Sequence, residues 1–240
     1  MATTSPDVPA GQSETLATSL RGMPSFLFDP PEAAKYVHGK WFWVGPLVVF
    51  SAVSVAAGFL MMPIVQHVLE VAPIPDGVAP ERYQRGIAIG TMIQKTAIFL
   101  APVTAAVIFS LQAAILLGAS SVFSARAKFR ELFNLVAGCG LIQAIAAIAA
   151  IVVLKSKGEI SNMAELRPAL GLDIFLPEGT NKFLAAFLGY FSVFEIWWIV
   201  MLLLIYSSAF RVSKAKALAV ILPLVLLSLV WRIGAAAFQR

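Results

Sequence analysis

The stretch LFNLVAGCGLIQAIAAIAAIVVL, residues 132–154, contains no Asp, Glu, Lys or Arg. It is as long as the roughly 20 apolar residues that a helix needs to cross a bilayer. Its second half shows no alternation of polar and apolar residues, which a strand of a membrane β-barrel would require. Because lipid offers no partner to a free backbone N–H or C=O group, the stretch predicts a transmembrane helix.

Four further apolar stretches of similar length flank it, at residues 43–62, 97–119, 183–206 and 217–237. Hydrophobic residues make up 59% of the chain, charged residues 13%, and the mean hydropathy is +0.84. A soluble domain carries roughly 25% charged residues, so this chain is too poor in charge to be coated by water. The fold class predicted is all-α: a polytopic membrane helical bundle with five transmembrane helices, preceded by a short interfacial helix.

Three regions follow from this pattern. Residues 1–25 are rich in small and polar residues and are expected to form a disordered cytoplasmic tail. Residues 26–41 form an expected interfacial amphipathic segment, in which Asp29 and the following prolines begin a short helix. Residues 42–240 form the five-span membrane domain. Prolines at positions 63, 73, 75 and 80 argue against a long helix between the first two spans until after Pro80, and 86–95 is expected to extend the second helix.

Basic residues are distributed equally between the two sides of this topology, so totals do not orient it. The density of basic residues in each loop does orient the protein, because short loops near the ends of spans have the strongest effect on topology. The two shortest loops each hold three basic residues, which places the N-terminus in the cytoplasm and the C-terminus on the opposite side of the inner membrane. These six residues are expected to contact lipid headgroups or an acidic partner. They are Arg126, Lys128 and Arg130 in one loop and Arg211, Lys214 and Lys216 in the other.

Glu195 lies near the middle of the fourth span. A carboxylate at that depth costs roughly 2.5–3.5 kcal/mol on insertion scales. It is either a proton or cation site, or a structural group that binds a neighbouring helix. Arg232 is its candidate partner, since a short hairpin brings the last two spans together. Alternatively, Arg232 extends to the outer interface and meets no carboxylate.

Other polar side chains inside the spans are Gln112, Gln143 and Asn134. Such groups more commonly join helices by hydrogen bonds than line a solute pathway. The third span is also rich in small residues between 137 and 150, which permit close helix packing.

No motif for catalysis or metal binding is present in the sequence. His38 and His67 lie far apart, and Cys139 is the only cysteine. The net charge of +5 is assigned to headgroup contact rather than nucleic acid. The sequence thus predicts no catalytic residue, no metal and no cofactor.

Several segments together resemble the bacterial branch of the Yip family, small five-span membrane proteins whose eukaryotic members interact with Rab-type GTPases. The similar segments are LFDPPEA (27–33), then Gly118 with Phe123, Phe129 and Asn134, then NKFL (181–184), FEIWW (194–198) and RVSKAKA (211–217). The chain departs from the family pattern at Ser192 and Val193, where an acidic residue is common, and at 141–142, where a proline is common. The resemblance implies no catalytic residues, and Rab partners are not carried over to this chain.

Two functions remain open. The first is a noncatalytic scaffold or adaptor in membrane organisation, whose partners are the lipid bilayer and another membrane protein or a second copy. The alternative is a small permease or proton- or ion-coupled pathway that uses Glu195. An internal repeat would favour a transporter, and five spans do not divide into equal halves.

Overall fold

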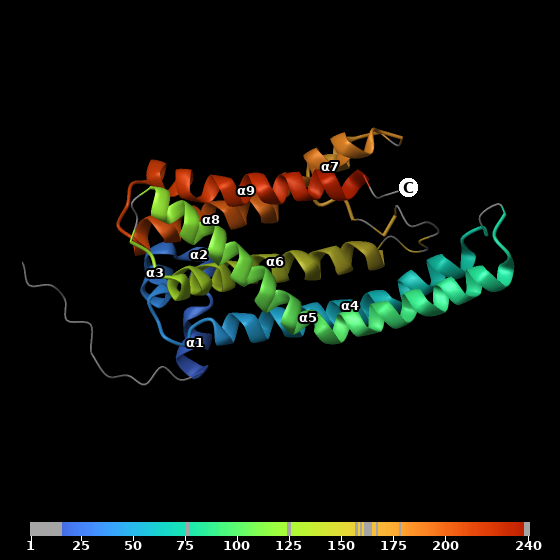
Figure 1. Cartoon of the computed structure of the whole chain (residues 1–240), viewed down its shortest axis with the longest axis horizontal. Coiled ribbons are helices and arrows are strands. Elements are labelled where there is room, and N and C mark those ends of the chain that lie inside the picture. The colour runs from blue at the N-terminus through green and yellow to red at the C-terminus, as the bar shows by residue number, and fades with distance from the viewer. Residues whose placement is uncertain are drawn as a thin grey trace, which may run out of the picture.

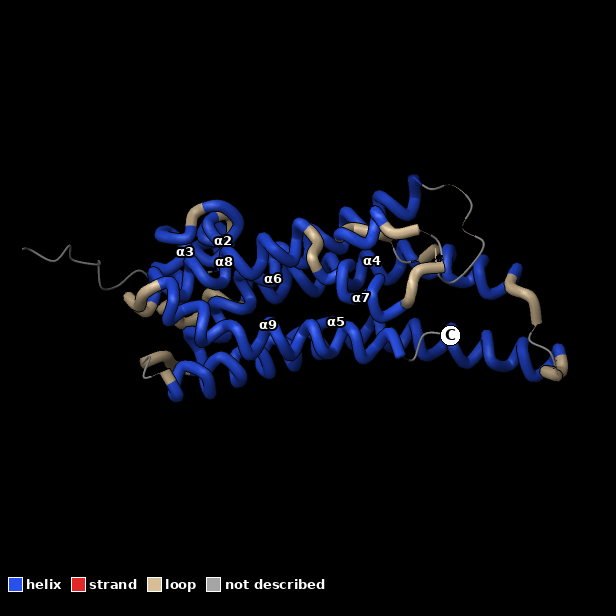
Figure 2. The backbone as a smooth tube through the Cα atoms, turned by 90° about the horizontal axis from the view of Figure 1, so that it is seen from above, coloured by secondary structure: helices blue, strands red, loops and turns tan. Residues whose placement is uncertain are grey.

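The computed structural model describes residues 16–74, 77–123, 126–156, 158, 160, 165–166, 168–177 and 179–237. Within these residues the chain is helical and contains no strand, so the all-α prediction is confirmed (Figures 1 and 2). The elements are α1 (Leu16–Gly22), α2 (Ser25–Phe28), α3 (Pro30–Val37), α4 (Val44–Val71), α5 (Pro80–Val122), α6 (Phe129–Ser156), the 3-10 turn η1 (Leu172–Phe175), α7 (Lys182–Tyr190), α8 (Val193–Ala209) and α9 (Lys214–Ala237).

Four helices, α4, α5, α6 and α9, are long and apolar enough to cross a membrane. The pair of α7 and α8 passes the same test when it is taken as one span, which makes up to five crossings, and its two halves are bent by 47°. Each predicted apolar stretch therefore corresponds to one of these crossings. The prediction of one continuous helix over 183–206 is wrong, because the chain leaves the helical conformation between Tyr190 and Val193.

The first crossing is longer than the sequence indicated. The prediction that no long helix lies between residues 63 and 80 is wrong, since α4 continues through Pro63 to Val71. Tertiary packing explains this continuation: Val68 is fully buried and packs with Leu154 and Ile160. Burying such side chains offsets the helix hydrogen bond that a proline removes. The α5 helix extends from Pro80, so the predicted extension over 86–95 is part of it.

The third crossing, α6, lies at the centre of the bundle, and its first half is almost entirely buried. Two of its glycines make room for aromatic rings. A Cβ on Gly138 would lie 2.2 Å from the ring of Phe26, and one on Gly140 would lie 2.6 Å from the ring of Phe109. The small residues of this span therefore admit side chains from α2 and α5, which is a different use from the close backbone approach usual between lipid-embedded helices.

The N-terminal helices α1, α2 and α3 gather at one end of the bundle, beside the turns between α5 and α6 and between α8 and α9 (Figure 1). The Asp29 side chain accepts a hydrogen bond from the Glu32 N–H group at 3.1 Å and so caps α3, as predicted. Phe26 and Val37 are fully buried in the main core. These short helices thus fill the end of the bundle, while their place at the membrane interface stays a prediction.

Candidate functional site

The break in the fourth crossing sets the position of Glu195. Ser192 has an extended backbone, with φ −81° and ψ 158°, and its hydroxyl accepts a hydrogen bond from the Glu195 N–H group at 3.1 Å. Glu195 is therefore the third residue of α8, at the positive end of the helix dipole, where a carboxylate is stabilised. The signal for this break was present in the sequence. Ser192 followed three residues later by Glu195 matches a capping box, which sequence reasoning missed.

A cavity of about 430 Å³ lies at this break and receives residues from all five crossings. Its polar lining includes four of the residues singled out in the sequence, Gln112, Gln143, Glu195 and Arg232, together with Tyr190 and Ser228. The rest of the lining is largely apolar and includes Phe109 and Trp198. The structure thus brings polar groups from α5, α6, α7, α8 and α9 around one space.

The Glu195 carboxylate is held by an amide. Gln143 Nε2 donates a hydrogen bond to Glu195 Oε2 at 3.1 Å. In a capping box the glutamate would instead reach back to the N–H group of the cap residue. Here the Ser192 N–H group donates to the Tyr190 carbonyl oxygen at 2.9 Å, which leaves the Glu195 carboxylate available to Gln143.

Arg232 lies on the same cavity but does not form an ion pair with Glu195. Among the described residues, ion pairs within 4.0 Å join Lys35 to Glu32 and His38 to Glu131. The Arg232 guanidinium instead reaches over Gly189, where an added Cβ would lie 3.3 Å from Arg232 Nη2 and 2.9 Å from Asp173 Oδ2. Arg232 and Glu195 therefore line the same cavity without contacting each other. Sequence reasoning gave no reason to expect Asp173 here.

The remaining hydroxyl groups of the cavity bind one another. Tyr190 Oη and Ser228 Oγ are 2.6 Å apart, and Ser228 Oγ donates to the Val225 carbonyl oxygen at 2.8 Å. The bond between Tyr190 and Ser228 joins α7 to α9. Gln112 lines the cavity half-buried, with no hydrogen bond to another described residue.

The cavity ends at a packed apolar layer on the side of the N-terminal helices. Trp198, Leu202 and Ile205, which follow Glu195 along α8, are all buried in the main core. The polar contact in this layer is the hydrogen bond between Ser120 Oγ and Tyr206 Oη at 2.8 Å, and both residues are fully buried. Along α8, a packed and largely apolar layer therefore lies between the lining of the cavity and the N-terminal helices.

Asn134 lies away from this cavity and binds backbone groups near the N-terminal helices. Its Oδ1 accepts from the Trp43 N–H group at 3.0 Å, and its Nδ2 donates to the carbonyl oxygens of Val37 at 2.9 Å and Gly39 at 2.8 Å. The side chain is fully buried. It satisfies three backbone groups of the segment that joins α3 to α4, and so fixes the N-terminal helices to α6.

The six predicted contact residues all lie at the end of the bundle that holds α1 to α3 (Figure 1). Arg126, Lys128 and Arg130 are exposed, as are Arg211 and Lys214, while Lys216 is partly exposed. Lys35 in α3 adds a further cation here, and the hydrogen bond from its amine to the Glu32 carboxylate raises the pKa of Lys35. We call this surface the basic end.

The turn between α8 and α9 has an unusual backbone. Arg211 adopts φ +51°, the left-handed conformation that usually falls to glycine. The Val212 N–H group donates to the Ser207 carbonyl oxygen at 3.1 Å, which completes a Schellman motif at the end of α8. A bulky cation thus occupies a position where an L-residue costs roughly 1 kcal/mol or more.

No curated protein and no solved structure matches the chain. The model of the Yip1 domain matches residues 25–233, from the start of α2 through most of α9. Because this match covers most of the chain, the protein belongs to the Yip1 domain family.

Proposed function

We propose that this integral membrane protein acts as a noncatalytic scaffold or adaptor, and that the basic end is the surface on which its partner docks. The observation that carries the proposal is the convergence of two basic loops, far apart in sequence, on one end of the bundle (Figure 1). Cations concentrated on one face attract acidic surfaces, whether of lipid headgroups or of another protein.

The packing of this end supports a docking surface. His38 joins three elements there: Nδ1 lies 3.1 Å from Glu131 Oε1, and Nε2 lies 3.1 Å from the Ala209 carbonyl oxygen. Together with Asn134, these bonds hold α3, α6 and α8 in a fixed relation beneath the basic loops. A partner would therefore meet a preformed surface and would not have to order it.

The same end supports an orientation. Basic loops face the cytoplasm in most membrane proteins. We place the basic end and the N-terminus in the cytoplasm, the C-terminus on the opposite side, and the protein in the cytoplasmic membrane. Partners in keeping with this arrangement are anionic lipid, a second copy of the chain, or an acidic membrane protein.

Crosslinking in native membranes tests the adaptor proposal. A photoreactive benzoylphenylalanine at Lys214, exposed at the start of α9, is expected to form adducts heavier than the monomer after irradiation. Replacing Arg126, Lys128 and Arg130 by glutamine should lower the adduct yield at least about tenfold, since each basic side chain near an acidic surface contributes about 1 kcal/mol. The yield is measured on denaturing gels and the adducts are identified by mass.

Lys95 provides the control, because it is exposed in the first half of α5, whose other end leads into the basic loop at 126–130. The same photoreactive residue at Lys95 should give adducts that the triple replacement leaves unchanged. The adaptor proposal fails if position 214 yields only monomer, or if the triple replacement has no effect on its adducts.

A second function is favoured by a specific observation, the carboxylate of Glu195 in a cavity at a broken crossing. Transporters commonly place substrate and ion sites where a membrane helix is interrupted. Against this stands the packed layer of Trp198, Leu202 and Ile205, which ends the cavity. A pathway would require that layer to open, and for this reason the adaptor remains the better supported function.

Flux measurements separate the two functions. The adaptor proposal predicts that the protein, reconstituted in liposomes, does not speed the decay of an imposed pH gradient, and that Glu195→Gln behaves in the same way. Proton flux through the parent protein that falls at least about tenfold in Glu195→Gln, while Gln112→Leu leaves it unchanged, would establish the pathway instead. Gln112 is the matched control because it lines the same cavity without a carboxylate.

A further inference from the structure

A groove runs between α4 and α6, on a different part of the bundle from the polar cavity. One part of it, about 360 Å³, has a wholly apolar lining apart from Lys155. Its wall on α4 is formed by Val53 and by two small residues, Ala56 and Ala57, which leave room for a chain to lie between the helices. Its wall on α6 consists largely of aliphatic side chains.

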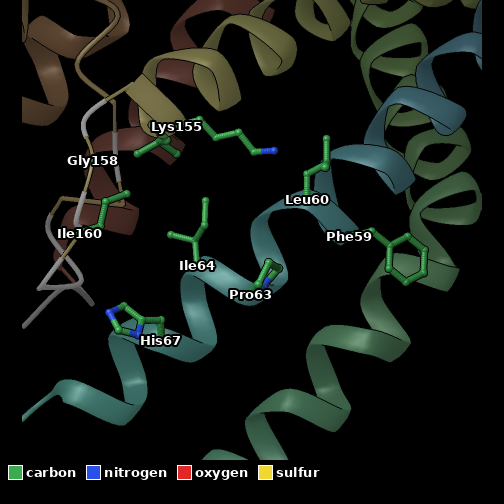
Figure 3. A pocket seen from close by; sticks show the side chains of 9 residues that line it. Phe59, Leu60, Pro63, Ile64, His67, Lys155, Gly158 and Ile160 are labelled. Carbon is green, nitrogen blue, oxygen red and sulfur yellow. The ribbon is translucent and has the colours of Figure 1, made fainter.

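The groove continues into a second hollow of about 480 Å³ toward the end where α6 finishes. Leu60 and Lys155 line both hollows, so the two form one continuous depression. His67 lies at the far end of the second hollow. Figure 3 shows the Lys155 amine pointing into this space, with Pro63 and Ile64 below it on α4.

The described lining of the groove carries positive charge without a described acidic residue. Its described lining residues include Lys155 and His67 and no Asp or Glu. Lys155 makes no hydrogen bond or ion pair with another residue that the structure describes. A cation aimed into an apolar groove without a partner is best complemented by an anion that carries an apolar chain.

Lys155 lies where the two hollows meet. It is in the last turn of α6, and the apolar hollow lies beside residues 148–152, further inside this apolar helix. Along α4 the apolar hollow extends from Val53 to Leu60, about 10 Å at 1.5 Å per residue, which accommodates part of an acyl chain. Basic side chains near the ends of membrane helices extend to the headgroups, so an anion bound at Lys155 can place its apolar chain in this hollow.

We propose that the groove is a binding site for one anionic phospholipid, with an acyl chain between α4 and α6 and the phosphate on Lys155. This site lies toward the end opposite the basic end and does not depend on the adaptor function. It selects lipid by charge, because a zwitterionic lipid brings no net negative charge to Lys155.

Native mass spectrometry of the full chain in a neutral detergent tests the site. The protein is incubated with phosphatidylglycerol or with phosphatidylcholine, and retained lipid is counted by mass. The parent should retain phosphatidylglycerol in preference to phosphatidylcholine. Lys155→Gln should bind phosphatidylglycerol about fivefold more weakly, the effect expected for one basic side chain at a headgroup. Lys95→Gln, which removes an exposed cation of α5 outside the groove, should not change binding.

A second pair of variants tests whether an acyl chain binds in the apolar hollow between α4 and α6. Ala57→Phe fills the apolar hollow and should reduce lipid retention at least about fivefold, whereas Val48→Phe adds the same ring nine residues earlier, on the opposite face of α4, and should not. The proposal is overturned if Lys155→Gln retains as much phosphatidylglycerol as Lys95→Gln, if the parent retains both lipids equally, or if Ala57→Phe matches Val48→Phe. A thermal melt of each variant confirms that it is folded.

Discussion

Replacing Asn134 by leucine is expected to lower the free energy of unfolding by at least about 3 kcal/mol. The substitution keeps the size of the side chain but leaves the Trp43 N–H group and the Val37 and Gly39 carbonyl oxygens without their partner. Each buried backbone group left unsatisfied costs about 1–3 kcal/mol. The measurement is equilibrium unfolding of the purified protein in mixed micelles of mild and denaturing detergent.

The loss of stability in Asn134→Leu should begin at the segment between α3 and α4. Because Asn134 holds the segment between α3 and α4, trypsin should cut the variant after Lys40 much faster than it cuts the parent. Gln112→Leu is the matched control, since it also replaces an amide with an aliphatic side chain and breaks no hydrogen bond to a described residue. Equal stability of the two variants, or unchanged cleavage after Lys40, would show that Asn134 does not fix the N-terminal helices.

Replacing Gly138 by leucine should destabilise the protein by about 3 kcal/mol and displace α2 from the bundle. A Cβ at this position would lie 2.2 Å from Cδ1 of Phe26, whose ring is fully buried and stacks on Phe42 with centroids 4.7 Å apart. Overpacking of this kind costs about 1–3 kcal/mol or more, because the ring has no free volume into which to move. Thermal unfolding in detergent measures the loss.

Gly118→Leu tests whether the effect belongs to this contact. A Cβ on Gly118, in α5, would meet nothing within 4 Å, so leucine there should be neutral or slightly stabilising, as leucine favours helix over glycine. Combining Gly138→Leu with Phe26→Ala should cost less than the sum of the two separate losses, because the shortened side chain vacates the space. Additive losses in this pair would refute the proposed clash.

Hydropathy was sufficient to predict the all-α fold and the approximate positions of the apolar helices, because the need to satisfy every backbone group in lipid allows few alternatives. Hydropathy failed to predict two features, the continuation of α4 past Pro63 and the break before α8, because both depend on specific local contacts. A proline such as Pro63 usually ends a helix, yet α4 continues past it to Val71, and the buried Val68 stabilises this continuation. Hydropathy does not reveal the break before α8, because the break depends on Ser192 capping the helix through the Glu195 N–H group.

The candidate site was only partly accessible to sequence reasoning. Gln143, Glu195 and Arg232 were singled out because polar groups are costly in lipid, and they line one cavity. Their pairing was not deducible: Glu195 binds Gln143, 52 residues earlier in the chain, and Arg232 lies near Asp173. The role of Asn134 was equally hidden, since its partners are backbone atoms some 90 residues away. Contacts of this range depend on how the helices pack, which hydropathy does not report.

The length of α5 has a consequence for where the hairpin of α4 and α5 can lie. Its 43 residues extend about 65 Å, whereas the bilayer measures about 40–45 Å with its headgroups. Even a tilt of 40°, at the limit of what membrane helices show, leaves about 50 Å along the membrane normal. The hairpin of α4 and α5 must therefore protrude from the membrane on the side that holds the C-terminus (Figure 1). An epitope inserted at Gly77 would be accessible to antibody only from the compartment into which the hairpin protrudes. Antibody binding to intact cells would therefore report the orientation of the protein.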